Sequence, residues 1–334
     1  MRAIGDLASF MLSSRFQASL RNSAEFAAQA ATTGLASDKA RHLGGATMAV
    51  SLLDRKEVLL EQHQRGIAEA ALFAGATQSI LGRIQDQTEG LTKNLALVSQ
   101  LAHGPDFKTM SNSASEVFID TVNALNSEIA GRHLFSGTDT QTSPLPDGAA
   151  VLDRLRSDVA GASSAQDLMN AIDTWFDAPG GVFETDAYQG SQTGFMTLPL
   201  SNSDTATFGL RADDDTLKDT LKALAKASLA ADDGLGLAAS EQAKLLRQGH
   251  FELVQSDRNL TEERASLGLT EAMIDATRIA TESDLARIAS DRLSLIGIDQ
   301  FEAASEFEAA QQQLEVFYRI AARQSRSSLV EYLR

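Results

Sequence analysis

Cysteine is absent from this chain of 334 residues, which excludes disulfides, thiolate nucleophiles and cysteine-bound metals. Only five prolines occur, and all lie within residues 105–199, so neither flank contains this helix-breaking residue. No eighteen apolar residues follow one another, and we therefore expect no membrane-spanning helix. Residues 1–18 have neither an unbroken apolar stretch nor a small-residue cleavage site, so we expect no classical secretory signal.

A clustered basic surface is also lacking, because the formal net charge is -16. Binding to nucleic acid phosphates or to an anionic membrane surface would require such a surface, so we expect neither partner. The negative charge is concentrated in the middle, where residues 139–233 hold sixteen acids and six bases, net -10. We interpret this stretch as a solvated exterior.

Residues that could carry chemistry are few and scattered. The five histidines show no i, i+4 pairing of the kind that helical metal sites use: His42, His63, His103, His133 and His250. Gly234, Gly236 and Ala239 match a dinucleotide fingerprint by letter, but no strand precedes them. No phosphate-binding loop or serine nucleophile elbow occurs. We therefore expect no catalytic, metal-binding or cofactor-binding residue, and a protein that is not an enzyme.

Apolar residues recur every seven positions in both flanks, which is typical of a coiled coil. The first series is Leu53, Leu60, Ile67, Ala74, Leu81, Thr88, Leu95 and Ala102. The second is Leu246, Leu253, Leu260, Leu267, Ile274, Thr281, Ile288 and Leu295. Each series predicts roughly 75 Å of helix. Two helices of equal length on either side of a proline-containing centre most simply pack antiparallel.

The middle of the chain mixes helical and strand patterns. Residues 149–177 and 216–230 have helical spacing, while 194–200 and 206–210 resemble short strands. The predicted fold class is therefore mainly α, with long antiparallel coiled-coil arms and a small inserted α+β domain. The predicted parts are an N-terminal assembly helix (1–45), a first arm (46–140), an acidic insert (141–227), a returning arm (228–295) and a C-terminal assembly helix (296–334). If the insert is separate, deleting 141–227 should leave the arms folded.

Three segments match the pattern of one known family. The most specific comprises Gly131, Arg132, His133, Leu134, Phe135, Ser136, Gly137 and Thr138, which is similar to the family's Gly-Arg-Tyr-Leu-Phe-Ser-Gly-Thr stretch with histidine in place of tyrosine. Residues 33–43 resemble the turn after the family's first terminal helix, although its Asp-Asp-Pro is here Asp38, Lys39 and Ala40. Residues 301–333, with Tyr318, resemble its C-terminal helix. Through these segments the chain resembles the flagellin family, and within it the hook-associated proteins of the hook–filament junction.

The resemblance implies an extracellular structural protein of the bacterial flagellum, exported without a cleaved signal and guarded by a cytoplasmic chaperone. It implies a ring of copies that joins the hook, through another hook-associated protein, to the flagellin filament. Apolar residues near the two ends are then the expected contacts between subunits: Phe10, Leu20, Phe307, Leu314, Phe317, Tyr318, Leu329 and Leu333. Isolated helices of this kind are marginal in water, so we expect these ends to order against neighbours.

Two other interpretations remain open. The chain could be a flagellin, which is made in thousands of copies per filament and not in a single ring. It could also be a cytoplasmic coiled-coil signalling protein, which would not appear outside the cell when flagella are made.

Overall fold

The computed structural model describes residues 2–98 and 104–332, and the side chains of 10–97 and 106–323. The helices are α1 (Arg2–Thr33), α2 (Lys39–His42), α3 (Met48–Val98), α4 (Gly104–Leu125), α5 (Gly148–Asp158), α6 (Ala165–Asp177), the π-helical turn η1 (Phe183–Ala187), α7 (Asp215–Ser228), α8 (Ala239–Ile296) and α9 (Gln300–Tyr332). The strands are β1 (Glu128–Ile129), β2 (Arg132–His133), β3 (Met196–Pro199) and β4 (Thr205–Phe208). The predicted fold class is confirmed.

The chain divides into two compact units: residues 1–62 with 280–334, and residues 63–279. The five-part division made from the sequence is not tested by this result and stays a prediction. Each unit is described separately below.

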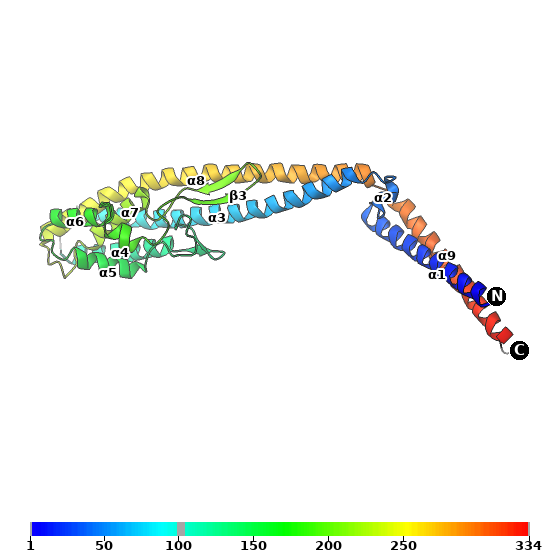
Figure 1. Ribbon diagram of the computed structural model, residues 1–334. Helices are drawn as coiled ribbons and strands as arrows, with labels where there is room; N and C mark the ends of the chain where they lie inside the picture. Colours follow the sequence, from blue (N-terminus) through cyan, green and yellow to red (C-terminus); the bar gives the residue numbers. More distant parts are fainter. Residues whose placement is uncertain (1, 99–103, 333–334) are drawn as a thin grey trace. The chain divides into compact units, whose positions relative to one another are not determined.

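In the larger unit, α3 and α8 lie side by side and run antiparallel (Figure 1). The amide of Gln78 donates to the Arg264 carbonyl oxygen at 3.4 Å, and that of Gln85 donates to an Asp257 carboxylate oxygen at 2.8 Å. The predicted heptad positions face inward, because Ile67, Leu81 and Leu260 are at most 1% exposed. These positions of both predicted stripes therefore lie between α3 and α8, whereas Ala102 lies outside the described residues and the coiled-coil character of the pair stays a prediction.

The middle of the chain forms the rest of this unit. α7 packs on α4 and α6, and α5 packs on α4. Strands β3 and β4 form an antiparallel hairpin in which Met196 pairs with Phe208 and Leu198 with Ala206. These four side chains are buried, while the alternate positions are exposed, as the period of two in a half-buried hairpin requires.

Close packing explains why position 66 in the first arm is a glycine. A Cβ atom at this position would overlap the carbonyl oxygen of Pro199, so glycine lets the β3–β4 hairpin approach α3 closely. Nearby, the rings of Phe73 and Phe208 lie 6.3 Å apart and pack the hairpin against the helix. Helix α3 continues through Gly66 without interruption.

In the smaller unit, the segments that precede α3 and follow α8 are joined by main-chain hydrogen bonds. The Ala36 amide donates to the Ile296 carbonyl oxygen at 2.8 Å, and the Ile298 amide donates to that of Gly34 at 2.9 Å. Buried Ala36, Val50 and Ile296 form a small apolar core at this point. This core lies between the end of α1 and the start of α9.

An ionic cluster lies beside that core. The guanidinium of Arg292 binds the carboxylates of Glu57 and Asp54, the latter at 2.7 Å, and Lys39 binds Asp54 at 3.2 Å. Burial raises the pKa of Asp54, but hydrogen bonds from Lys39 and Arg292 outweigh that effect and leave its pKa below the ordinary value. The cluster thus ties α3, α8 and the segment before α3 together.

Candidate functional site

The two terminal helices, α1 and α9, lie side by side and run antiparallel (Figure 1). The seam between them consists mostly of small side chains. The buried residues of this seam are Leu20, Ala24, Ala27, Ala30, Ala303 and Ala310. An alanine side chain buries little apolar area, so each contact contributes little stabilisation, but small side chains let the helix axes come close. The pair is therefore close-packed but has only a modest apolar core.

Large apolar side chains lie on the outside of the same pair. They are Phe10 (69% exposed), Met11 (53%), Leu12 (67%), Phe16 (56%), Phe26 (45%), Phe301 (81%), Val316 (53%), Tyr318 (44%) and Ile320 (59%). At about 100° of rotation per residue, Met11, Phe301 and Val316 point almost directly away from the seam. The apolar surface consequently extends around the pair and is not confined to one edge.

Polar contacts pin the register of the two helices. The hydroxyl oxygen of Tyr318 accepts hydrogen bonds from Arg21 Nη2 at 2.8 Å and from Gln17 Nε2 at 3.0 Å. These bonds, that from Arg21 first, lower the pKa of Tyr318. Alongside, the rings of Phe16 and Phe317 lie 5.9 Å apart. A slip of one helix along the other would break all of these contacts.

An open groove of about 430 Å³ runs along this surface. Phe16 of α1 and Val316, Phe317 and Ile320 of α9 form its apolar lining. A groove lined in this way on the outside of a two-helix pair is suited to receive an apolar side chain of another helix.

The predicted assembly residues differ in their exposure. Leu20 is buried in the seam, whereas Phe307, Leu314 and Phe317 are half-buried beside it. Phe10 and Tyr318 are exposed. The side chain of Leu329 and the whole of Leu333 lie outside the described part of the chain. The assembly role of all eight remains a prediction.

Sequence reasoning missed seven of these nine exposed residues: Met11, Leu12, Phe16, Phe26, Phe301, Val316 and Ile320. The heptad search selected residues on one stripe, and these lie off it. The signal that could have found them is the presence of large apolar residues on more than one side of a predicted surface helix.

The segment that carries the family resemblance starts as a tight hairpin in the larger unit. Ala130 and Gly131 take the turn with φ values of 51° and 79°. Arg132 binds the Glu69 carboxylate at 2.8 Å and lies 5.9 Å from the centre of the Phe73 ring. These two contacts of Arg132 hold the segment against α3.

The following residues connect distant parts of the chain. Phe135 is fully buried, and its carbonyl oxygen accepts from the Ala212 amide at 2.9 Å. The Ser136 hydroxyl donates to the Thr142 carbonyl oxygen at 2.6 Å, while the Ser136 carbonyl oxygen accepts from the Ser191 amide at 2.9 Å.

Gly137 has φ of 63°, and a Cβ there would lie 3.0 Å from the Ser191 carbonyl oxygen, so a side chain is excluded. Leu134 is buried and the Thr138 hydroxyl donates to the Thr193 carbonyl oxygen at 3.3 Å. All of these contacts are structural, and the residues Gly131 to Thr138 organise the fold of the larger unit.

Within residues 2–98 and 104–332 no cluster of three or more histidine, aspartate or glutamate side chains could hold a metal ion. The ring nitrogens Nδ1 of His133 and His250 lie 3.0 and 3.2 Å from main-chain carbonyl oxygens of Asn126 and Thr92. Among the described helices, none is long and apolar enough to cross a membrane.

One half-buried carboxylate, that of Glu263, is expected to make the stability of the larger unit depend on pH. Burial raises the pKa of Glu263, and the charge of Asp214 raises it further. A carboxyl whose pKa is higher in the folded state stabilises the fold below its unfolded pKa, and this contribution is lost as pH rises through the folded pKa. Glu263→Gln should therefore raise Tm at pH 7 by about 1 °C.

Thermal unfolding followed by circular dichroism at pH 7 and pH 4 measures this effect. The gain should disappear at pH 4, where the wild-type carboxyl is largely protonated in the folded state. Glu116→Gln, at an exposed position, is the control and should leave Tm unchanged at both pH values. A lower Tm for Glu263→Gln at pH 7 would show that the charged form is favoured.

No protein-family model and no curated protein matches the chain. Among solved structures, FlgL of Bacillus cereus matches with a TM-score of 0.52 and 14% identity, over 73% of this chain and 100% of that one. A protein of Vibrio parahaemolyticus described as flagellar hook-associated matches with a TM-score of 0.42 and 11% identity, over 72% and 96% of the two chains. Because the identity with FlgL is only 14%, this match shows a shared fold and nothing more. The shared fold extends over the whole length of FlgL.

Proposed function

We propose that the chain is a structural subunit of the bacterial flagellum, a hook-associated protein of the hook–filament junction, known in this family as hook-associated protein 3. In this role copies form an adaptor ring that joins another hook-associated protein on the hook to the first flagellin subunits. The fold shared with FlgL and the resemblance of residues 131–138 support this assignment.

The observation that carries the proposal is the outer surface of the α1–α9 pair. Among the described side chains, nine large apolar ones are exposed there over most of the circumference of the pair. Large exposed apolar surfaces are rare on monomeric soluble proteins and mark contacts with other proteins. Neighbouring subunits on several sides of the pair would cover it, as an axial assembly requires.

The same role places the protein outside the cell, at the base of the filament. It would reach that place by flagellar export without a cleaved signal, after binding a cytoplasmic chaperone. A chain with no cysteine cannot form the disulfides that would hinder passage through a narrow channel in an unfolded state.

Immunogold labelling of purified flagella tests the proposal. Label confined to the junction of hook and filament supports it, and deletion of the gene should leave hooks without filaments and release flagellin into the medium. Label along the whole filament would identify the chain as a flagellin. Label found only inside cells would favour a cytoplasmic coiled-coil protein and overturn the proposal.

Export without cleavage predicts the mass of the extracellular protein. Intact-mass spectrometry of the protein from sheared flagella should find the encoded N-terminus, with at most Met1 removed. Cytoplasmic protein from the same cells provides the reference mass. Loss of some twenty N-terminal residues from the extracellular form would mean a cleaved signal and a different export route.

A further inference from the structure

Helix α8 has a second apolar stripe, on its solvent side, within the larger unit. The residues share heptad spacing and are all exposed: Ala265, Leu269, Ala272, Ala276 and Ile279. Leu269 is 75% exposed and Ile279 is 59% exposed. The seam residues Leu267, which is half-buried, and Ile274, which is buried, lie on the opposite side of the helix. This stretch of α8 is thus apolar both toward its own chain and toward solvent.

Helix α3 has a matching uncharged stripe with the same alternation of four and three residues. Its exposed members are Ala68, Leu72, Gly75 and Ser79, of which Leu72 is 53% exposed. The Ser79 hydroxyl donates to the Gly75 carbonyl oxygen at 2.8 Å, so it needs no outside partner. A Cβ at Gly75 would meet no atom within 4 Å, which leaves an open depression at that point.

The two stripes lie at the same level of the antiparallel arms. Because Gln78 contacts Arg264, ten residues toward the N-terminus of α3 and ten toward the C-terminus of α8 bring Ala68 level with Ile274, in the turn that contains Ala276. By the same register Ser79 lies level with Glu263, in the turn that contains Ala265. Two copies standing side by side at equal height would therefore place the α8 stripe of one opposite the α3 stripe of the other.

In that register the side chains are complementary in size. Leu72 faces Ala272, and Leu269 faces the depression at Gly75, so each large side chain meets a small one, as in knobs-into-holes packing. Arg65 faces Ile279, whose apolar side chain the methylene stem of arginine can cover.

The charges beyond the apolar stretch are complementary as well. Asp86 of α3 falls opposite Arg258 of α8, and Arg83 falls next to Glu262. All four side chains are exposed, and none has a hydrogen bond or ion pair within the described part of the chain. An acid therefore meets a base at both positions.

We propose that the α8 stripe of one copy packs antiparallel on the α3 stripe of a second copy at the same level. The two surfaces differ, so the contact is heterologous, and it forms a ring when the rotation between copies closes. This inference rests on the proposed function, because it supplies the lateral contact between subunits of the adaptor ring.

Disulfide cross-linking tests the contact directly, because the chain contains no cysteine. Cells producing Ala68→Cys and Ala276→Cys copies together should, after oxidation of isolated flagella, give a cross-linked dimer. Either copy alone should give none. The control pair is Ala68→Cys with Ala265→Cys, in which the partner is displaced by about 16 Å along α8.

A dimer from the control pair, or none from the first pair, overturns the inference. A chain with both Ala68→Cys and Ala276→Cys should give a ladder of cross-linked species that ends at the ring size.

Charge reversal provides a second test at exposed positions. Asp86→Arg or Arg258→Asp alone should reduce the yield of the Ala68–Ala276 cross-link about five-fold, and the two together should restore it. Reduction by each single change without restoration in the double variant would contradict this pairing.

The inference and the proposed function can fail separately. If immunogold places the protein at the junction but no cross-link forms, the inference is wrong and the proposed function stands. If the protein is absent from flagella, the proposed function is wrong, and the cross-link is then assayed on the purified chain. Its absence there overturns the inference too.

Discussion

Deleting residues 141–227 and closing the gap with a short linker is expected to destroy the cooperative fold of the larger unit. One continuous cluster of buried side chains extends from Ile67 of α3 through the middle of the chain to Leu260 of α8. This packing does not favour a separable insert, so we expect the opposite of the outcome anticipated from the sequence, in which the arms remain folded without it.

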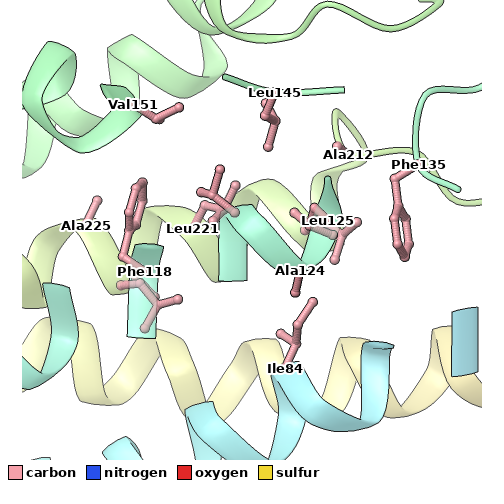
Figure 2. Packing of buried hydrophobic residues seen from close by; sticks show 14 of the residues in the cluster. Ile84, Phe118, Ala124, Leu125, Phe135, Leu145, Val151, Ala212, Leu221 and Ala225 are labelled. Atoms are coloured by element: carbon pink, nitrogen blue, oxygen red, sulfur yellow. The ribbon is translucent and has the colours of Figure 1, made fainter. Parts of the chain in front are cut away.

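Helix α7 is the main reason for this expected result. Leu217, Leu221 and Leu224 are all completely buried. Figure 2 shows Leu221 of α7 in the same interior as Phe118 and Leu125 of α4 and Ile84 of α3. Removing α7 would expose this face of α4 to water.

A buried lysine strengthens the same connection. The Lys226 ammonium binds Asp173 of α6 and Glu252 of α8, each at 2.7 Å, and its side chain is 4% exposed. Deletion would remove the lysine and Asp173 and leave Glu252 without its cation. A half-buried carboxylate that loses its partner is destabilising.

Circular dichroism and thermal unfolding of the deletion variant measure the outcome. We expect loss of much of the helical signal and no cooperative transition for the larger unit. Leu221→Ala is a milder version and should cost about 2–5 kcal/mol of unfolding free energy. The matched control, Leu269→Ala at an exposed position, should change it by less than about 0.5 kcal/mol. Full helical signal in the deletion variant would restore the separable insert.

The arms could be predicted from the sequence because their seams follow a simple rule. Apolar residues, mostly leucine and isoleucine, repeat every seven positions, which is typical of a coiled coil. The flanks also contain no proline that would break such helices. The N-terminus of α7 could also be predicted, since Asp214 occupies the N-cap position, Asp215 lies in the first turn, and acidic side chains favour a helix N-terminus.

The burial of α7 on nearly every side could not be predicted. Its other faces carry Ala223, Ala225 and Ala227, all completely buried, and alanine is common on buried and exposed surfaces alike. The solvent-side stripes of α3 and α8 escaped notice for the same reason, because alanine, glycine and serine give no clear hydrophobic period.

The terminal helices reverse the usual rule. Large apolar residues were assigned to one predicted contact stripe, but the structure has alanines in the seam and phenylalanines outside it. Leu20 follows the rule, whereas Phe16 and Phe301 do not. A sequence selected to fit between neighbours carries its large apolar residues on surfaces that a single chain cannot bury.

Val316→Asp is expected to abolish motility and leave the isolated subunit as stable as the wild type. Val316 is 53% exposed in the single chain and points away from the seam, so the substitution breaks no contact of the α1–α9 packing. It does introduce a charge into the groove formed with Phe16 and Ile320. If a neighbour covers this groove in the assembly, an unpaired carboxylate there costs several kcal/mol per subunit.

The same cost is incurred by every copy, so a ring should fail to form, filaments should be missing, and flagellin should accumulate in the medium. Swimming assays, electron microscopy and immunoblots of the medium measure these results, and circular dichroism of the purified subunit checks its Tm. The matched control is Gln311→Asp, which adds the same charge to an exposed polar position of α9 outside the groove. Control cells should swim normally.

Normal swimming of the Val316→Asp strain would mean that the groove stays open to solvent in the assembled flagellum, and a large fall in Tm would mean that Val316 belongs to the core of the single chain. Either result would remove the apolar outer surface of the terminal helices as the basis of the proposed function.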